Sequence, residues 1–426
     1  MNTYPAYKDS GVEWIGEIPS EWSVERLGHF FTERKKKVDD ISYPPLSVTM
    51  NGILDQLDDV AKSDDTTNRK LVLKNDFVIN SRSDRKGSSG ISFRDGSVSL
   101  INTVLEPKNI YPNYVEYLLK SYHFIEEYFR FGKGIHFDLW STNFSVMKNI
   151  KIPVLSIEKQ QQISDYLDYK TSKIDTLIEK TQQKIELLKE QRTSLINTTV
   201  TKGLNPNVEM KDSGVEWIGE IPSGWELKPL KYFSEITLGK MLTPKDPGGY
   251  VLKPYLRSKN VQSEIPDITD VREMWFSEKD LKKYKLNRED LLVNEGGDAG
   301  RTTIWNNELS EVYIQNSVNR VKIVKGVSRY YLYQFTLNHV TGYFDSIVSR
   351  VSIPHLTKDK LERVKFICPS RQEQQQIVDY LDKETLKIDK LIDIESRRID
   401  LLKEYRQSLI SDVVTGKVDV RNGVLV

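Results

Sequence analysis

The side chains best suited to chemistry in this sequence lie in loops that combine basic and amide residues with serine and glycine. Arginine and lysine suit guanine and phosphate groups, asparagine and glutamine suit adenine, and serine hydroxyls and glycine amides can hold phosphates. These loops predict a DNA interface, although a solvated turn is the alternative for any single residue. The candidate DNA-binding residues are Ser81, Arg82, Arg85, Lys86 and Lys133 in the first half of the chain, and Arg257, Lys259, Asn260, Arg301, Gln315, Asn316 and Arg350 in the second.

Motifs for catalysis are weak by comparison. The glycine-rich segment 296–300 lacks the lysine and hydroxyl that end a phosphate-binding loop, no Gly-x-Ser-x-Gly elbow occurs, and five scattered histidines give no metal spacing. Asp267, Asp280 and Lys282 loosely fit a metal-dependent nuclease, but the pattern occurs in one half only, in a chain with 29% charged residues. We therefore expect no catalytic residue, metal or cofactor in this chain, with a nuclease as an alternative.

Composition predicts the compartment. The single cysteine, Cys368, excludes an internal disulfide framework and fits a reducing cytosol. The sequence has no apolar run near the ~18 residues of a membrane span and no signal peptide at its start, so we expect a cytoplasmic protein. The formal net charge of +1 indicates neither nucleic acid nor disorder by itself.

The chain repeats itself, and the repeats must position the polar loops. The segment Lys8–Ser20 recurs without change at Lys211–Ser223, an offset of 203 residues. A longer block that begins at Gln160 recurs from Gln374, an offset of 214. The regions between the repeats show no obvious similarity beyond their first dozen residues. The repeated segments thus form two similar frames, and each frame holds a different insert. This arrangement indicates that the frames serve a shared assembly function and that each insert has its own recognition function.

The long repeat is predicted to be a helix, because some 43 residues lack proline and glycine and carry an apolar stripe near a 3.5–3.6 period. Lys170, Lys184 and Glu384 interrupt a strict heptad, so we expect an imperfect coiled coil. A lone helix of roughly 64 Å would expose its stripe, and the simplest partner is the stripe of the other copy. A two-fold relation between the copies would make the helices antiparallel, although a connector of some 25 residues also permits a parallel pair, and packing of each helix on its own domain is a further alternative.

Each insert is predicted to be mixed α/β, since short β-rich runs such as 77–79 and 321–324 alternate with helix-like stretches such as 114–129 and 329–338. The expected fold class is therefore α/β (α+β) globular domains in two copies, with two long coiled-coil-like helices and an internal duplication. The predicted segments are an N-terminal repeat at 1–21, a first recognition domain at 22–157, a spacer helix at 158–202, a repeat linker at 203–224, a second recognition domain at 225–371, a second spacer helix at 372–415 and a C-terminal tail at 416–426.

Over nearly its whole length, this arrangement resembles the specificity subunit of a type I restriction–modification system. The most specific elements are the doubled Val-Glu-Trp-Ile-Gly-Glu-Ile-Pro-x-x-Trp segment at Val12–Trp22 and Val215–Trp225, and the doubled Gln-Gln-Ile-x-Asp-Tyr-Leu-Asp helix start at Gln161–Asp168 and Gln375–Asp382. Residues 152–155 and 367–370 look like the family's Ile-Pro-x-Pro lead-in to each helix, although neither copy keeps the full form.

The resemblance implies two target recognition domains that each read one half of a split asymmetric DNA site, with antiparallel helices that set the gap. It also implies a subunit without a catalytic centre. Two methyltransferase subunits would bring S-adenosylmethionine, and restriction and translocase subunits would add ATP with magnesium. The helices and tryptophan-rich segments would dock the methyltransferases. The expected subunit-interface residues are Trp14, Trp22, Leu167, Ile174, Leu188, Trp217, Trp225, Leu381, Ile388 and Leu402.

An adaptor that binds only proteins is the alternative function, and the charge distribution bears on the choice. The inserts at 22–157 and 225–371 carry net charges of +2 and +6, whereas the remaining segments together carry −7. The near-neutral total therefore averages two basic inserts with a mildly acidic frame. The modest +2 of the first insert indicates that partner subunits neutralise much of the DNA phosphate charge.

Overall fold

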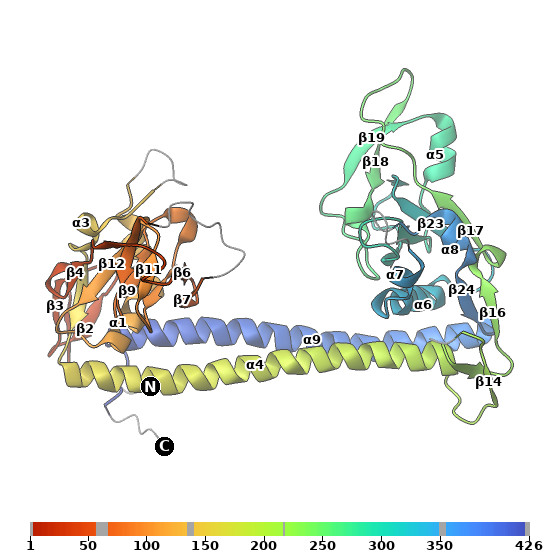
Figure 1. Ribbon diagram of the computed structural model, residues 1–426. Helices are drawn as coiled ribbons and strands as arrows, with labels where there is room; N and C mark the ends of the chain where they lie inside the picture. The colour runs from red at the N-terminus through yellow and green to blue at the C-terminus, as the bar shows by residue number, and fades with distance from the viewer. Residues whose placement is uncertain (1–2, 57–66, 134–139, 216–217, 349–354, 422–426) are drawn as a thin grey trace. The chain divides into compact units, whose positions relative to one another are not determined.

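The computed structural model describes residues 3–56, 67–133, 140–215, 218–348 and 355–421, and the chain forms two compact units (Figure 1). The first unit combines residues 1–182 with 396–426, and the second contains residues 183–395. Each unit consists of one globular domain and part of each long helix. Among the described residues, no helix is both long and apolar enough to span a membrane.

The globular domain of the first unit is built on an antiparallel sheet with the strand order β10-β9-β12-β4. Its helices cover an apolar face, since Tyr114, Leu118 and Phe124 share a core with Phe77. The elements are β4 (Phe31–Glu33), β5 (Lys37–Val38), β6 (Leu46–Thr49), β7 (Gly52–Asp55), β8 (Arg69–Val72), β9 (Phe77–Asn80), β10 (Ser89–Ile91), β11 (Gly96–Val98), β12 (Asn102–Pro107), α1 (Pro112–Leu119), α2 (Tyr122–Arg130) and α3 (Phe144–Met147).

The domain of the second unit repeats this sheet, because its order β17-β23-β20-β21 is the same when read from the opposite edge. A smaller lobe of β18, β19 and β22 has its own core of Tyr255, Met274, Phe276 and Tyr313. The elements are β17 (Ser234–Leu238), β18 (Val251–Leu256), β19 (Arg272–Phe276), α5 (Glu278–Tyr284), β20 (Leu291–Asn294), β21 (Thr302–Ile304), β22 (Tyr313–Ile314), β23 (Val318–Ile323), α6 (Ser328–Val340), α7 (Tyr343–Ile347) and α8 (Lys358–Arg363). The predicted α/β class and duplication are therefore confirmed.

Short two-stranded ladders mark where the chain enters and leaves each domain. In the first unit, β3 (Ser23–Arg26) pairs with β13 (Lys151–Val154). In the second, β16 (Glu226–Pro229) pairs with β24 (Lys365–Cys368). A hairpin precedes each ladder, and the hairpin strands are β1 (Tyr7–Asp9) with β2 (Glu17–Pro19), and β14 (Met210–Asp212) with β15 (Glu220–Pro222). The strand that enters each insert is paired with the strand that leaves it. Each insert is therefore attached to the rest of the chain through one two-stranded ladder, which we call its neck.

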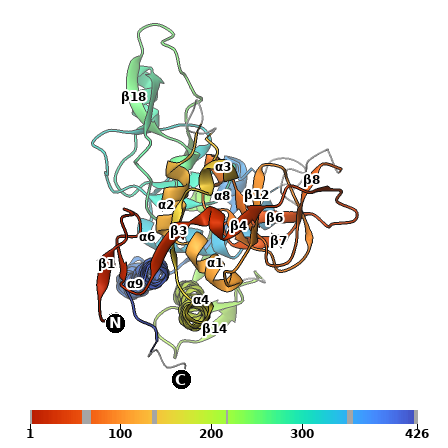
Figure 2. The same cartoon turned by 90° about the vertical axis from the view of Figure 1, so that its left-hand side faces the viewer.

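The long helices α4 (Ile157–Lys202) and α9 (Arg371–Val414) run antiparallel within each unit. In the first unit Arg406 Nε lies 2.8 Å from Asp175 Oδ1, and Figure 2 shows the two helices side by side, viewed nearly end-on. In the second unit the equivalent Arg192 Nε lies 2.9 Å from Asp389 Oδ1. Residue numbers rise along α4 as their partners fall along α9, which confirms the antiparallel alternative.

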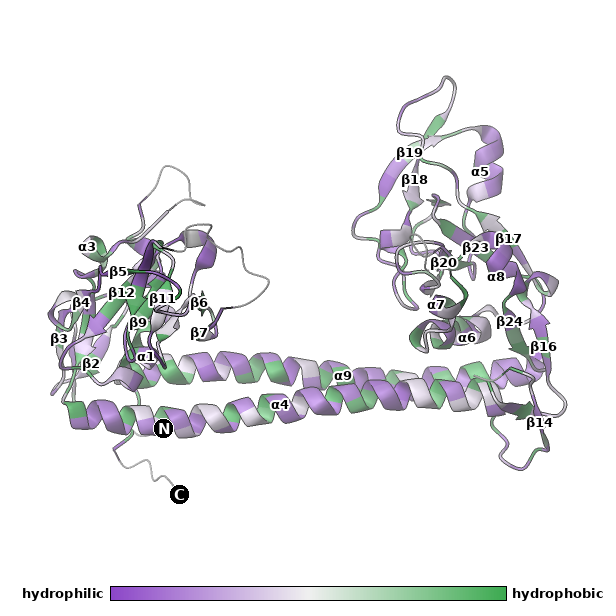
Figure 3. Cartoon of the chain, in the orientation of Figure 1, coloured by the Kyte–Doolittle hydropathy of each residue, from purple (hydrophilic) through white to green (hydrophobic). Residues whose placement is uncertain are grey.

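The apolar stripes of the two helices face each other, and hydrophobic and hydrophilic turns alternate along both (Figure 3). Ion pairs accommodate one of the charges that interrupt the heptad: Lys184 Nζ lies 2.5 Å from the carboxylate of the buried Glu395. Removing one member of such a pair leaves a desolvated charge, so the pair specifies which helical positions meet.

The burial of these stripes corrects the predicted subunit interface. The side chains of Trp22, Leu167 and Leu381 are at most 1% exposed, so they pack within this chain and are not available to another. Trp14 and Leu402 are partly buried against the core of the first unit, and Trp217 lies outside the described residues. The other predicted interface residues that are buried are Ile174, Leu188, Trp225 and Ile388.

A pair of tyrosines seats each domain on the long helices, and this repeat within the divergent inserts was not predicted from the sequence. Tyr117 Oη donates to Asp168 Oδ1 at 2.6 Å in the first unit, and Tyr333 Oη donates to Asp382 Oδ1 at 2.5 Å in the second. Burial raises the pKa of both phenols, so they remain neutral donors. Three residues earlier, Tyr114 donates to the Val414 carbonyl in the first unit, and Tyr330 donates to the Val200 carbonyl in the second.

Candidate nucleic-acid interface

Three of the predicted polar loops of the second unit meet at one end of its main sheet. The loop at Gln315–Ser317 links β22 to β23. The Ser317 carbonyl accepts hydrogen bonds from the Glu295 amide at 3.0 Å and from Ser258 Oγ at 3.3 Å. The structure therefore brings the segments around 258, 295 and 315 together, although they are far apart in the sequence.

The connection that leaves β17 joins the same patch. The Asn316 amide donates to the Lys240 carbonyl at 2.9 Å, and the Lys240 amide donates to the Ile314 carbonyl at 3.0 Å. Gly239 permits this approach, because a Cβ atom there would lie 2.4 Å from the backbone of Gln315. Gln315 and Asn316 are half-buried, and their side-chain amides form no hydrogen bond with the other described residues, so these groups can receive a base edge.

Arg257 and Lys259, in contrast, already form ion pairs with a carboxylate of this chain. Arg257 Nη2 lies 2.5 Å from Asp270 Oδ2, and Lys259 Nζ lies 3.0 Å from the same oxygen. The hydrogen bond from Lys259 holds the pKa of Asp270 below its usual value, and Arg272 adds a third positive charge. A DNA phosphate would therefore compete with the Asp270 carboxylate for these donors.

We expect Asp270→Asn to tighten binding to non-specific DNA by roughly 3- to 10-fold at 0.1 M salt, because it releases Arg257 and Lys259. Fluorescence anisotropy with a salt titration measures both the affinity and a steeper salt slope. The matched control is Asp267→Asn, which removes the same charge but keeps an oxygen that can accept from Thr269, and Asp267 forms no ion pair with another described residue. Equal effects of both variants would show that net charge alone, rather than release of these donors, is responsible.

One prediction in the second unit is corrected, and Arg301 stays a prediction. Asn260 is 1% exposed, and its amide donates to the backbone carbonyls of Asp267 and Asp270, so it holds the loop instead of reading DNA. Arg301 is half-buried, donates to Gln262 Oε1 at 3.3 Å and pairs with Asp298 at the same distance. Arg350 lies outside the described residues.

The predicted loops of the first unit also converge. Ser141 exchanges backbone hydrogen bonds with Lys133 and forms a bridge with Arg82, while the next amide, Thr142, donates to the Ser81 carbonyl at 3.0 Å. The Ser81 hydroxyl donates to the Ile101 carbonyl at 2.6 Å, so its proton is used within the chain. Segments 81–82, 133 and 99–101 thus form one patch, which is the counterpart of segments 295 and 315–317.

The basic side chains of this first patch differ in availability. Lys86 Nζ lies 2.6 Å from Glu126 Oε1, so it is held by α2. Arg82 and Arg85 flank Asp84 at 3.9 and 3.8 Å, distances of weak surface ion pairs, and both are exposed. Arg82, Arg85 and Lys133 are therefore the predicted cations best placed to meet a phosphate.

The sequence interpretation overlooked residues of the same face. The chain after β4 carries Lys35, Lys36 and, at the start of β5, Lys37; all three are exposed, and a run of three lysines was a visible signal. The turn before β12 places the exposed Leu100 and Ile101 where the second unit has Asn316 and Ser317. Apolar side chains at this position suit contact with thymine methyl groups rather than hydrogen bonding.

The nuclease candidates occupy structural positions. The Asp280 carboxylate accepts from the Ser277 amide in the capping box of α5 and pairs with Lys240 at 3.5 Å. Asp267 accepts from the amide and hydroxyl of Thr269. Lys282 is exposed on α5. Across the residues that the structure describes, no group of three or more His, Cys, Asp or Glu side chains is placed to hold a metal ion.

Comparison with known proteins gives one consistent family. The model of the type I restriction modification DNA specificity domain matches twice, over residues 19–187 and 222–404, so each match contains one insert and most of the following long helix. The chain is 24% identical over 440 residues to the putative type I restriction enzyme MjaX specificity subunit of Methanocaldococcus jannaschii, covering 96% of both proteins. It is also 24% identical over 433 residues to the type I restriction enzyme MjaVIII specificity subunit of that organism, covering 95% of both.

Solved structures share the fold. A chain from a structure of complex assembly and conformational transition in the type I R-M system superimposes with a TM-score of 0.66 at 17% identity, over 94% of this chain and 99% of that one. The HsdS subunit from Thermoanaerobacter tengcongensis superimposes with a TM-score of 0.53 at 16% identity, over 94% and 98%. The predicted architecture therefore agrees with two solved chains of similar length.

Proposed function

Because this chain belongs to the type I restriction modification DNA specificity domain family, we propose that it gives a type I restriction–modification complex its DNA sequence specificity and catalyses no reaction itself. This family membership favours DNA recognition over the protein-binding adaptor and the nuclease. The observation that carries the proposal is the doubled patch, in which equivalent loops of two unrelated sequences gather at the same end of equivalent sheets.

Each domain reads one half of a bipartite, asymmetric DNA site, and the paired helices set the unspecified gap between the halves. Support comes from the separate, closed neck of each domain and from the different side chains that the two patches present. Gln315 and Asn316 suit hydrogen bonding to adenine, whereas Leu100 and Ile101 suit thymine methyl groups. Two different half-sites follow from two different patches.

The partners are two methyltransferase subunits, which bring S-adenosylmethionine, and restriction and translocase subunits, which use ATP with magnesium; the assembly acts on DNA in the cytoplasm. Exposed apolar residues on the helices supply docking positions in place of the buried ones. Leu187 and Leu401 are equivalent in the long repeat and are 64% and 65% exposed. Burial of such side chains against a partner would remove apolar surface from water.

We expect Leu401→Glu or Leu187→Glu alone to reduce the number of bound methyltransferase subunits from two to one, and the double variant to bind none, because a buried unpaired carboxylate opposes docking. Mass photometry of the assembled complex counts the subunits. The matched controls, Lys403→Glu and Lys189→Glu, introduce the same side chain about 200° around each helix. Loss of both partners from a single variant would contradict two independent docking sites.

Methylome sequencing of cells that express this chain with its methyltransferase tests the proposed function. The expected result is N6-methyladenine in each half of one split sequence motif. Methylation without a motif, or a motif that is unchanged when this chain is omitted, would refute a specificity role.

A further inference from the structure

Two exposed apolar side chains lie at the edge of the second patch. Met241 is 76% exposed and Leu242 is 53% exposed, and they are consecutive. Scattered exposed apolar residues are common, but this pair belongs to the connection that contacts the Gln315–Ser317 loop. The pair lies beside polar residues suited to base edges. A ligand at this position would therefore make both apolar contacts and hydrogen bonds.

The backbone on both sides of the pair is held in place. On one side, Lys240 exchanges hydrogen bonds with the carbonyl of Ile314 and the amide of Asn316. On the other side, the Thr243 carbonyl accepts from the Trp275 amide at 3.0 Å, and Thr243 Oγ1 donates to the Met241 carbonyl at 3.1 Å. Met241 and Leu242 therefore project from a supported turn, so little chain entropy is lost when they bind.

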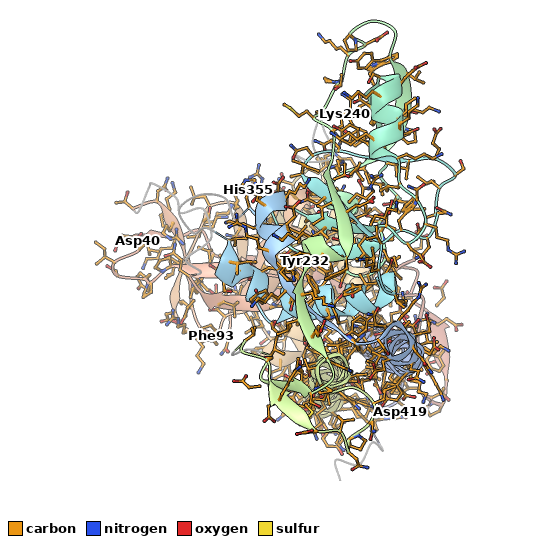
Figure 4. All side chains as sticks on the ribbon, turned by 90° about the vertical axis from the view of Figure 1, so that its right-hand side faces the viewer. Asp40, Phe93, Tyr232, Lys240, His355 and Asp419 are labelled. Atoms are coloured by element: carbon orange, nitrogen blue, oxygen red, sulfur yellow. The ribbon has the colours of Figure 1, made fainter. Side chains whose placement is uncertain are left out.

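The turn lies at the outer end of β17. Figure 4 shows Lys240 next to α5, whereas Tyr232, which precedes β17, lies nearer to the long helices. The two apolar side chains thus belong to the end of the sheet where the polar loops gather, and not to the end that is seated on the helices.

The first unit indicates what this position faces. The offset of 203 residues relates β4 to β17, because Glu33 and Ile236 have equivalent partners on the neighbouring strand. Beyond these strands the two copies diverge: Lys37 begins β5, which pairs with β8, whereas Lys240 contacts the Gln315–Ser317 loop. The chain after β4 carries Lys35, Lys36 and, at the start of β5, Lys37, and neither Lys36 nor Lys37 forms an ion pair with another described residue. Exposed lysines are suited to phosphates, so in the first unit the chain that leaves the strand equivalent to β17 is suited to face the nucleic acid.

We infer that Met241 and Leu242 form an apolar wedge that enters the DNA base stack beside the half-site read by the second domain. The inference rests on the proposed DNA-specificity function. An apolar side chain that enters a base step unstacks it and bends the duplex, and the bend brings more DNA into contact with the protein. Lys240, which precedes the wedge, is held by Asp280 and Thr243 and fixes the base of the wedge. In this way the second domain recognises how easily the DNA sequence is deformed, in addition to its base edges.

The test uses the full-length chain assembled with its methyltransferase, and duplexes that carry the motif found by methylome sequencing. 2-Aminopurine replaces one base at a time through the second half-site and its flanks, and its fluorescence rises when it is unstacked. We expect a several-fold rise at one step with the unaltered protein. Met241→Ala combined with Leu242→Ala should abolish this rise and weaken binding by roughly tenfold, comparable to the loss of one good base contact.

Two controls separate the wedge from other causes. Val324→Ala removes a comparably exposed side chain, 48% exposed, beyond the opposite end of β23, and should leave fluorescence and affinity unchanged. Adenine flipping for methylation also unstacks a base, but it occurs at the methylated position and should persist in the double variant. Exchange of the two residues, Met241→Leu with Leu242→Met, should retain the fluorescence rise.

The outcomes distinguish this inference from the proposed function. A complex that binds its motif while every 2-aminopurine outside the methylated adenine stays quenched would overturn the wedge alone. A fluorescence rise that survives the double alanine variant would do the same. A complex without sequence preference would overturn the DNA-specificity proposal, and the wedge with it.

Discussion

Trp225→Ala is expected to destabilise the second unit by about 3–5 kcal/mol, because it removes a large side chain from a closed core. Trp225 is 4% exposed and packs against Gly203, where a Cβ atom would lie 3.0 Å from the indole ring. Its Nε1 donates to Glu373 Oε1 at 3.1 Å, which ties the duplicated segment to the start of α9. Urea unfolding followed by circular dichroism measures the loss.

The duplication supplies a matched control for this prediction. Trp22 is equally buried in the first unit, but no partner of its Nε1 is found among the described residues. Trp225→Phe should therefore cost about 1 kcal/mol more than Trp22→Phe, the value of the indole hydrogen bond. Equal costs would mean that the bond to Glu373 contributes nothing to stability.

Exchange of residues 225–371 for the equivalent insert of another family member is expected to change one half of the recognised DNA motif completely and to leave the other half intact. The reason is structural: β16 and β24 close the neck of the insert, and its patch is formed from loops within that insert. Methylome sequencing of the hybrid reports both halves at once. Altered bases in both halves would show that the domains do not read DNA independently.

The seating tyrosines set a condition on this exchange. The hybrid needs Tyr330 and Tyr333 or equivalent residues, because they bind the end of α4 and the Asp382 side chain on α9. A hybrid that replaces both with phenylalanine is the control: it should keep its new specificity but lose stability, since Asp382 loses a buried donor. The reciprocal exchange of residues 22–157 should alter only the other half of the motif.

Much of the fold follows from the sequence, because identical repeats and a long periodic stripe are strong signals. The stripe correctly predicted the other long helix as its partner, whereas the family resemblance placed Leu167 and Leu381 in the interface with the methyltransferases, and their burial within this chain contradicts that assignment. The tyrosine pairs escaped notice because Tyr114 with Tyr117, and Tyr330 with Tyr333, are short matches within divergent sequence. Only the three-dimensional contacts reveal that both pairs seat a domain on the long helices.

The candidate site was less predictable, for a physical reason. Loops rich in asparagine, arginine and serine suit DNA, but the same side chains also cap and cross-link loops. Asn260 satisfies the carbonyls of its own loop, and Asp270 pairs with the two cations that precede that asparagine, Arg257 and Lys259. Sequence composition reports which groups are present, whereas only geometry reports which of them are already bound.

The path of the chain through the first unit has a consequence for biosynthesis. Tyr7 donates to the Lys417 carbonyl, Gly416 packs against Pro19, and Arg421 lies over the ring of Tyr4, so the earliest residues are held by some of the latest. The second unit is one continuous stretch, residues 183–395, whereas the first needs residues from 396 onward. During translation the second recognition domain can therefore mature on the ribosome, while the first, although synthesised earlier, is completed last. For this interval the nascent first domain exposes the apolar surface that α9 will cover.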